Sequence, residues 1–278
     1  MTLLLWILGG VVLVTAILIY CVAPGKMSPE AEKSAKHFFG LNCAHRGLHT
    51  KDQKIPENSI ASFIAARDAG YGIELDIQIS KDGQVIVFHD DNLKRACGVD
   101  ETAKNVDWSE LSELSLFSTD EKIPLFADAL DAIGDAPIVV ELKPIGSNYA
   151  EFCQKTLDIL REKGKFWCIE SFDPRICRWF RKNAPDVLRG QLSCPPSKFF
   201  LISKFNAFLL GHLLTNFISR PHYLAYRANT HPITIKLCRL FKPMTAVWTV
   251  TPEHDIEFFE KYNDIVIFEY YNPPAKFK

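Results

Sequence analysis

The stretch GIELDIQI, residues 72–79, decides the fold. Apolar and polar side chains alternate along it, and this spacing of two is typical of a β-strand. Glu74 and Asp76 therefore project from one face of the predicted strand, while Leu75 and Ile77 project from the other. The turn-forming run KDGQ follows at residues 81–84, and a short apolar run follows the turn.

Strand-like and helix-like segments alternate on both sides of this stretch. Such alternation indicates a parallel sheet with right-handed crossovers, and a closed (β/α)8 TIM barrel over residues 41–278 is the best fit. Neither GxGxxG nor GxxxxGK[ST] occurs, so a nucleotide-binding fold gains no support. Strands are expected at residues 41–44, 72–79, 85–88, 136–142, 166–169, 187–190, 222–226, 245–250 and 265–268.

The predicted strands carry polar residues at the ends where TIM barrels place their chemistry. Glu74 and Asp76 share one strand, Glu141 lies on another, and a later strand ends in Glu170. The carboxylates Glu74, Asp76 and Glu141 are candidate ligands of one hard divalent cation, Mg²⁺ or Ca²⁺. Zinc is disfavoured, since no cysteine cluster accompanies them. The alternative is a set of ordinary ion pairs, Glu74 with Arg46 and Glu141 with Lys143.

Two histidines and two cations also follow strand ends. Imidazole titrates near neutral pH, so His45 and His89 are candidates for a general acid–base pair. Arg46 and Lys143 are candidates for binding phosphate oxygens. A cation, an acid, a base and two positive side chains are the parts that phosphoryl-group displacement requires. His49 and His254 are expected in solvated loops near the same rim.

At these residues the chain resembles the glycerophosphodiester phosphodiesterase family, within the phospholipase C-like phosphodiesterase superfamily. The resemblance covers about residues 41–270 and rests on motifs that occur in family order. These are HRG at 45–47, PENS at 56–59, ELD at 74–76, HD at 89–90 and ELK at 141–143.

The resemblance implies a TIM barrel that hydrolyses a glycerophosphodiester to glycerol phosphate and an alcohol. It implies one Mg²⁺ or Ca²⁺ on Glu74, Asp76 and Glu141, acid–base catalysis by His45 and His89, and phosphate binding by Arg46 and Lys143. Trp248 would wall the substrate pocket, and Glu57 would support the metal site or Arg46. Attack by water and attack by the substrate's own glycerol hydroxyl both stay open. The family usually ends its last strand with an aspartate, where this chain has Glu269.

Residues 1–24 are expected to form a transmembrane anchor, followed by a juxtamembrane linker with a helix over residues 25–40. No charged side chain lies between Thr2 and Pro24, and the stretch is long enough to span a bilayer. A cleavable signal peptide is disfavoured, because the basic n-region and small-residue cleavage site are missing. Cysteines without a paired spacing indicate free thiols in a reducing compartment. A single-pass membrane protein with a cytoplasmic catalytic domain is the resulting prediction.

The apolar segment at residues 198–219 has three interpretations: a packed barrel helix, a dimer contact, or an element resting on the membrane. The last would suit a lysophospholipase D-type activity on lysophospholipids or related membrane-resident diesters, as an alternative to a soluble glycerophosphodiester. A non-catalytic membrane scaffold is a third hypothesis. The formal net charge of −1 and the lack of a basic groove signature argue against nucleic acid. Oligomeric state is not readable from the sequence.

Overall fold

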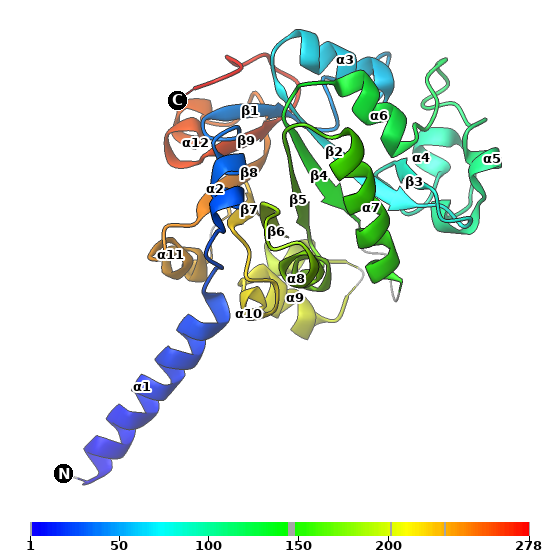
Figure 1. The fold of residues 1–278 in the computed structure, drawn as a ribbon. Coiled ribbons are helices and arrows are strands. Elements are labelled where there is room, and N and C mark those ends of the chain that lie inside the picture. The colour runs from blue at the N-terminus through cyan, green and yellow to red at the C-terminus, as the bar shows by residue number, and fades with distance from the viewer. Residues whose placement is uncertain (1, 144–147, 201, 231, 278) are drawn as a thin grey trace.

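A computed structural model describes residues 2–143, 148–200, 202–230 and 232–277. A long helix, α1 (Thr2–Val22), extends from a rounded domain (Figure 1). A short helix, α2 (Pro29–Ala35), connects it to the first strand. Ser28 caps α2 by accepting a hydrogen bond from the amide of Ala31, and Pro29 occupies the first helical turn, as expected for a helix start.

Eight parallel strands close into a barrel, which confirms the predicted (β/α)8 fold. Each strand pairs with the next in the ring, and the pairing of the first strand with the second closes it. The strands are β1 (Leu41–Ala44), β2 (Gly72–Ile79), β4 (Ile138–Leu142), β5 (Trp167–Ser171), β6 (Arg189–Ser193), β7 (Tyr223–Arg227), β8 (Met244–Val250) and β9 (Ile265–Phe268).

Helices cover the outside of the barrel between these strands. Their starts follow local capping chemistry: Ser59 and Ser62 form a capping box, and Asp173 caps the helix that begins at Pro174. The outer helices are α3 (Ile60–Asp68), α6 (Phe126–Ile133), α7 (Tyr149–Lys163), α8 (Pro174–Asn183), α11 (Ile233–Arg239) and α12 (Ile256–Tyr262). Between β6 and β7 lie η2 (Pro196–Lys198), α9 (Lys204–Gly211) and α10 (Asn216–Ser219).

The strand expected at 85–88 forms, but it lies outside the barrel. β3 (Val85–Val87) runs antiparallel to the end of β2, because the turn at residues 81–84 returns the chain along the strand it has just left. The segment that follows builds a small second core beside the barrel. It contains α4 (Lys94–Cys97), η1 (Ala103–Asn105) and α5 (Trp108–Leu111).

Most strands differ from the sequence-based expectation by one or two residues at a boundary, and β6 differs most. β6 begins at Arg189 and runs to Ser193, two residues later than predicted at its start and three at its end. The Val187 amide instead donates to the carbonyl of Ala184 in the turn that leaves α8. The apolar segment at 198–219 contains the end of η2 and two short helices, α9 and α10.

The end of the barrel where the strands begin is closed by the chain that follows α2. Phe38 is fully buried there with Leu41, Tyr223 and Ile265, and the ring of His37 stacks on Phe166 at 4.0 Å. The opposite end of the barrel is therefore the one that can admit a ligand.

We expect Phe38→Ala to destabilise the domain by about 3–5 kcal/mol, since the truncation leaves a cavity in this closure. The neighbouring Phe39→Ala is the matched control, because Phe39 is 45% exposed and its loss should cost far less. Chemical denaturation followed by circular dichroism measures both. Equal destabilisation by the two variants would contradict the assignment of Phe38 to the closure.

Candidate active site at the mouth of the barrel

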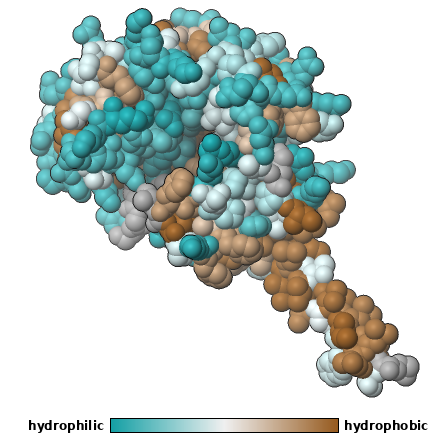
Figure 2. Space-filling model, turned by 180° about the vertical axis from the view of Figure 1, so that it is seen from behind, coloured by the Kyte–Doolittle hydropathy of each residue, from teal (hydrophilic) through white to brown (hydrophobic). Residues whose placement is uncertain are grey.

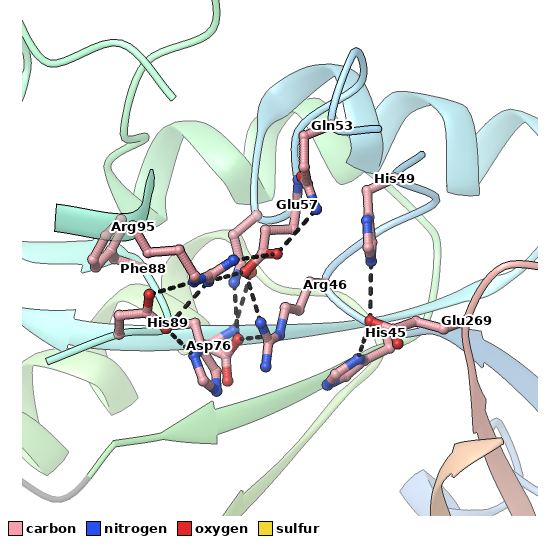
Figure 3. A network of polar contacts seen from close by, with 12 residues as sticks. His45, Arg46, His49, Gln53, Glu57, Asp76, Phe88, His89, Arg95 and Glu269 are labelled. Carbon is pink, nitrogen blue, oxygen red and sulfur yellow. Dashed lines mark hydrogen bonds and ion pairs between the residues drawn. The ribbon is translucent and has the colours of Figure 1, made fainter. Parts of the chain in front are cut away.

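Polar side chains from several strands converge at the carboxyl ends of the strands (Figure 3). His45 and Arg46 directly follow β1, Glu141 lies near the end of β4, and Glu269 directly follows β9. Chain segments that are distant in sequence thus meet at one mouth, as the barrel topology requires.

The centre of the mouth is a cluster of three buried carboxylates: Glu74, Asp76 and Glu141. Asp76 and Glu141 are register partners on neighbouring strands, and one oxygen from each of the three acids lies within 4.8 Å of the others. Their exposed fractions are 2%, 0% and 7%. The sequence prediction that these three acids converge is confirmed in geometry.

Two cations offset part of this charge. The ammonium of Lys143 lies 2.8 Å from Oδ1 of Asp76 and 2.9 Å from Oε1 of Glu141. Nε of Arg46 lies 3.4 Å from Oδ2 of Asp76. Lys143 thus pairs with Glu141, as the ion-pair interpretation proposed, and it pairs with Asp76 as well.

Burial and mutual repulsion disfavour the ionised forms of two of these acids. Burial and the neighbouring Asp76 and Glu141 carboxylates raise the pKa of Glu74 well above its usual range, and burial raises the pKa of Glu141 to about 7. For Asp76, burial opposes ionisation, yet Lys143 and other cations outweigh it and lower the pKa. Oxygen ligands in this number and spacing suit a hard divalent cation.

Arg46 is held in place by a second network. Its backbone amide donates to Oε2 of Glu74 at 3.0 Å, and its guanidinium donates to Oε1 of Glu57 at 2.6 Å. Arg95 donates to both oxygens of Glu57 and both of Asp90. Arg46 adopts a left-handed backbone, φ 55°, which is uncommon for a non-glycine residue and points to a constrained role at this turn.

His45 is oriented by Glu269. Nδ1 of His45 lies 2.9 Å from Oε1 of Glu269, and Nε2 of His49 lies 3.2 Å from the same oxygen. His49 is 7% exposed, so the expectation of a solvated loop was wrong, because the residue packs against Glu269 and the ring of Tyr270. Burial alone would raise the pKa of Glu269, but the hydrogen bonds from His45 and His49 outweigh it and lower this pKa.

His89 lies on the other side of Asp76 from His45 in the view of Figure 3. Its Nδ1 lies 2.6 Å from Oδ1 of Asp90. Burial and the nearby Lys143 lower its pKa, and burial and Arg46 lower that of His45. Both imidazoles are therefore biased toward the neutral form, with Nδ1 engaged by a carboxylate.

The structure adds polar residues that the sequence did not single out for a role. Glu170 lies inside the barrel, accepts a hydrogen bond from the Tyr223 hydroxyl at 3.0 Å, and has its pKa raised to about 8 by burial and Glu141. The amide of Asn58 donates to Oδ2 of Asp76 at 2.8 Å. Glu170 ends a predicted strand and Asn58 lies in the PENS motif, but no sequence signal pointed to Arg95.

Trp248 lies at the rim of the mouth. Its ring packs edge-on against Phe172 at 5.6 Å, and the guanidinium of Arg227 lies 6.0 Å from its centre. Trp248 comes from β8 and Phe172 follows β5, so the two rings form an aromatic border between strands on that side of the mouth.

A parallel (β/α)8 barrel with a buried acidic cluster and two histidines at its mouth is the architecture of a TIM-barrel enzyme. The model of the glycerophosphoryl diester phosphodiesterase family matches residues 45–268. The chain belongs to this family, as the sequence motifs indicated.

Several relatives resemble the chain over part of its length. A glycerophosphodiester phosphodiesterase of Caldanaerobacter subterraneus is 31% identical over 163 residues, which is 55% of this chain and 66% of that protein. A human lysophospholipase D, GDPD1, is 31% identical over 125 residues, which is 40% of this chain and 39% of that protein. The chain thus covers less than two thirds of the length of these relatives.

Solved structures show the same fold over most of the chain. A phosphodiesterase of Oleispira antarctica in complex with sn-glycerol-3-phosphate has a TM-score of 0.70 at 23% identity, covering 87% of this chain and 96% of that one. A glycerophosphodiester phosphodiesterase of Thermotoga maritima has a TM-score of 0.61 at 27% identity, covering 82% and 93%.

Proposed function

We propose that the chain is a metal-dependent phosphodiesterase that hydrolyses a glycerophosphodiester to glycerol phosphate and an alcohol. The observation that carries the proposal is the buried cluster of Glu74, Asp76 and Glu141 at the barrel mouth. Family membership and the names of the Caldanaerobacter and Thermotoga relatives support the reaction class. The product in the Oleispira structure, sn-glycerol-3-phosphate, supports the glycerol side of the substrate.

Glu74, Asp76 and Glu141 would hold one Mg²⁺ or Ca²⁺. A divalent cation suits this site because acidic side chains outnumber basic ones in the mouth. Four buried carboxylates face two cations there, Arg46 and Lys143; the acids are Glu74, Asp76, Glu141 and Glu170. When bound, the ion neutralises charge on the phosphate and polarises the phosphorus for attack.

Arg46 and Lys143 would bind the phosphate. Nε of Arg46 donates to no described residue, while Glu57 fixes the other end of the guanidinium. The donor fork therefore stays oriented with hydrogen-bonding capacity left for a phosphate oxygen. Lys143 is buried with its ammonium at the carboxylate cluster, where a second positive charge favours an anionic substrate.

His45 and His89 would transfer the protons. A carboxylate at Nδ1 of each ring, Glu269 or Asp90, holds the tautomer that leaves Nε2 for the substrate. One imidazole would accept a proton from the attacking oxygen, and the other would donate one to the leaving alcohol. Glu269 would act as a positioning residue through His45, in the place where the family usually has an aspartate. Trp248 would border the part of the pocket that receives the alcohol.

A second candidate substrate is a lysophospholipid, cleaved in a lysophospholipase D manner. The anchor-like helix α1 and the apolar segment at 198–219 favour it, and the human relative carries that activity in its name. Both substrates present the same glycerophosphodiester to the mouth and differ only in the acyl chain.

α1 is long and apolar enough to cross a membrane, and signal sequences share this length and composition. We propose an uncleaved single-pass anchor, because the end of α1 is fixed to the barrel. Asn216 and Cys238 donate to the carbonyl of Val22, and Arg220 donates to those of Tyr20 and Ala23. The eight free cysteines, six of them buried, support a reducing, cytoplasmic location for the domain.

Removal of divalent ions with EDTA should abolish turnover, and Mg²⁺ or Ca²⁺ should restore it. Because a bound ion stabilises only the folded state, it should also raise the melting temperature of the wild-type chain. Glu141→Gln should weaken ion affinity by at least about 100-fold and reduce this shift. Glu110→Gln, an exposed site on α5, is the control. An ion-induced shift as large in Glu141→Gln as in wild type would refute the assigned ligands.

His45→Ala and His89→Ala should each lower kcat by about 10²–10⁴-fold, the usual contribution of a general acid or base. His37→Ala, at the closed end of the barrel, should leave kcat unchanged. Steady-state assays with circular dichroism as a folding check measure this. Full turnover in both mouth variants would favour the non-catalytic scaffold instead.

Choline release from glycerophosphocholine and from lysophosphatidylcholine, assayed side by side with the full chain in bilayers, should distinguish the two substrates. A lipid-directed enzyme should show the higher kcat/KM for lysophosphatidylcholine. A clear preference for glycerophosphocholine would eliminate the lysophospholipase D alternative and leave the main proposal intact.

A further inference from the structure

The longest segment without any acidic residue lies in the second half of the barrel. Residues 187–252 hold eight Lys and Arg and no Asp or Glu, although the whole chain has 32 basic and 33 acidic residues. This segment runs from β6 to the end of β8 and includes α9, α10 and α11. Six of its basic side chains are exposed: Lys198, Lys204, Arg227, Lys236, Arg239 and Lys242.

The same helices expose large apolar side chains. Phe205 on α9 is 69% exposed, and Ile233 at the start of α11 and Leu240 after its end are each 74% exposed. Side chains of this kind are costly to leave in water as a group. Further members are Phe200, Phe208, Phe217 and Phe241. We call these apolar residues and the six exposed basic residues the apolar–basic face.

The apolar–basic face adjoins the helix that can span a membrane. The ring of Tyr20 near the end of α1 lies 6.1 Å from that of Phe217 on α10, and Val22 packs with Leu213 and Cys238. In Figure 1, α9, α10 and α11 lie on the side of the barrel from which α1 extends. Figure 2 shows apolar surface continuing from α1 onto the body of the domain.

The face also reaches the mouth of the candidate active site. Phe199, between η2 and α9, packs edge-on against Phe172 at 5.9 Å, and Phe172 packs against Trp248. A continuous series of aromatic rings thus joins the start of the face to the rim of the barrel.

We propose that the apolar–basic face rests on an anionic phospholipid bilayer, the one that α1 crosses, with its phenylalanines at the acyl boundary and its Lys and Arg at lipid phosphates. Exposed aromatic and basic residues on the same helices are the composition of interfacial elements, and each basic side chain near an anionic surface adds attraction. A second copy of the chain fits less well, since a two-fold contact would bring the six uncompensated positive charges of each copy together.

The bilayer contact has a consequence for substrate preference, which rests on the proposed function. With the face on the bilayer, the aromatic rim beside Trp248 lies next to the lipid surface, so a diester with one acyl chain could enter the mouth without leaving the membrane fully. The bilayer contact would thereby favour lysophospholipids over diesters dissolved in water.

The test uses the full chain in nanodiscs that carry brominated acyl chains, made of phosphatidylcholine alone or mixed with phosphatidylserine. Phe205→Trp places a reporter on the face, and Val99→Trp is the matched control, being 38% exposed and following α4, away from α1 (Figure 1). The Phe205→Trp reporter should add blue-shifted emission that bromine quenches, at least twofold more than the control reporter. Phosphatidylserine should strengthen this quenching, and Lys236→Glu with Arg239→Glu should weaken it, while Lys104→Glu should not.

Equal quenching of the two reporters would overturn the proposal. Blue-shifted emission without quenching would also overturn it, since that result indicates a protein partner such as a second copy. Quenching that is independent of phosphatidylserine would refute the anionic preference. The readout requires no turnover, so its failure is separate from a failure of the proposed reaction. Phe205→Asp with Phe208→Asp should lower activity on lysophosphatidylcholine in bilayers and leave glycerophosphocholine hydrolysis unchanged.

Discussion

Mutual repulsion among buried carboxylates is the constraint on which the mouth of this barrel depends. Glu74, Asp76 and Glu141 share one small volume with little access to water, and burying such charges without compensation costs several kcal/mol each. The protein supplies Lys143 and Arg46 against them. Burial, together with the neighbouring carboxylates, still raises the pKa values of Glu74, Glu141 and Glu170. A site held in this state is prepared to take up further positive charge.

The rest of the mouth keeps that cluster from rearranging. Asn58 binds Asp76 from the loop before α3, and the backbone of Arg46 binds Glu74 from the loop after β1. Glu57 then fixes Arg46, and Arg95 fixes Glu57. Each of these bonds would weaken if the acids turned toward solvent, so the network opposes the movement that would relieve their repulsion. The three acids therefore stay close together because the residues that bind them are themselves held in place.

The sequence predicted the parts of this arrangement that follow from local periodicity. The period of two in residues 72–79 placed Glu74 and Asp76 on one face, and the barrel topology brought Glu141 to the same end, as the register of β2 and β4 confirms. Pairings across long sequence separations were not predictable. The hydrogen bonds that Glu269 accepts from His45 and His49, and that Glu170 accepts from Tyr223, depend on which strand ends become neighbours in the closed ring. The exit of β3 from the barrel likewise depends on the length of β2 beyond its barrel partners.

The closed end of the barrel and α1 together determine which way the mouth faces. Arg220 donates to carbonyls at the carboxyl end of α1, and its guanidinium lies 4.6 Å from the ring of Tyr20, a favourable place for a cation at the end of a helix. Only a short linker separates this contact from α2, and the chain after α2 fills the closed end. The barrel is therefore attached to α1 at two points, through α2 and through α10 and α11. Two attachments restrict rotation of the domain about α1 far more than a single flexible linker does. The same side of the domain therefore faces α1, and the mouth keeps one orientation relative to that helix.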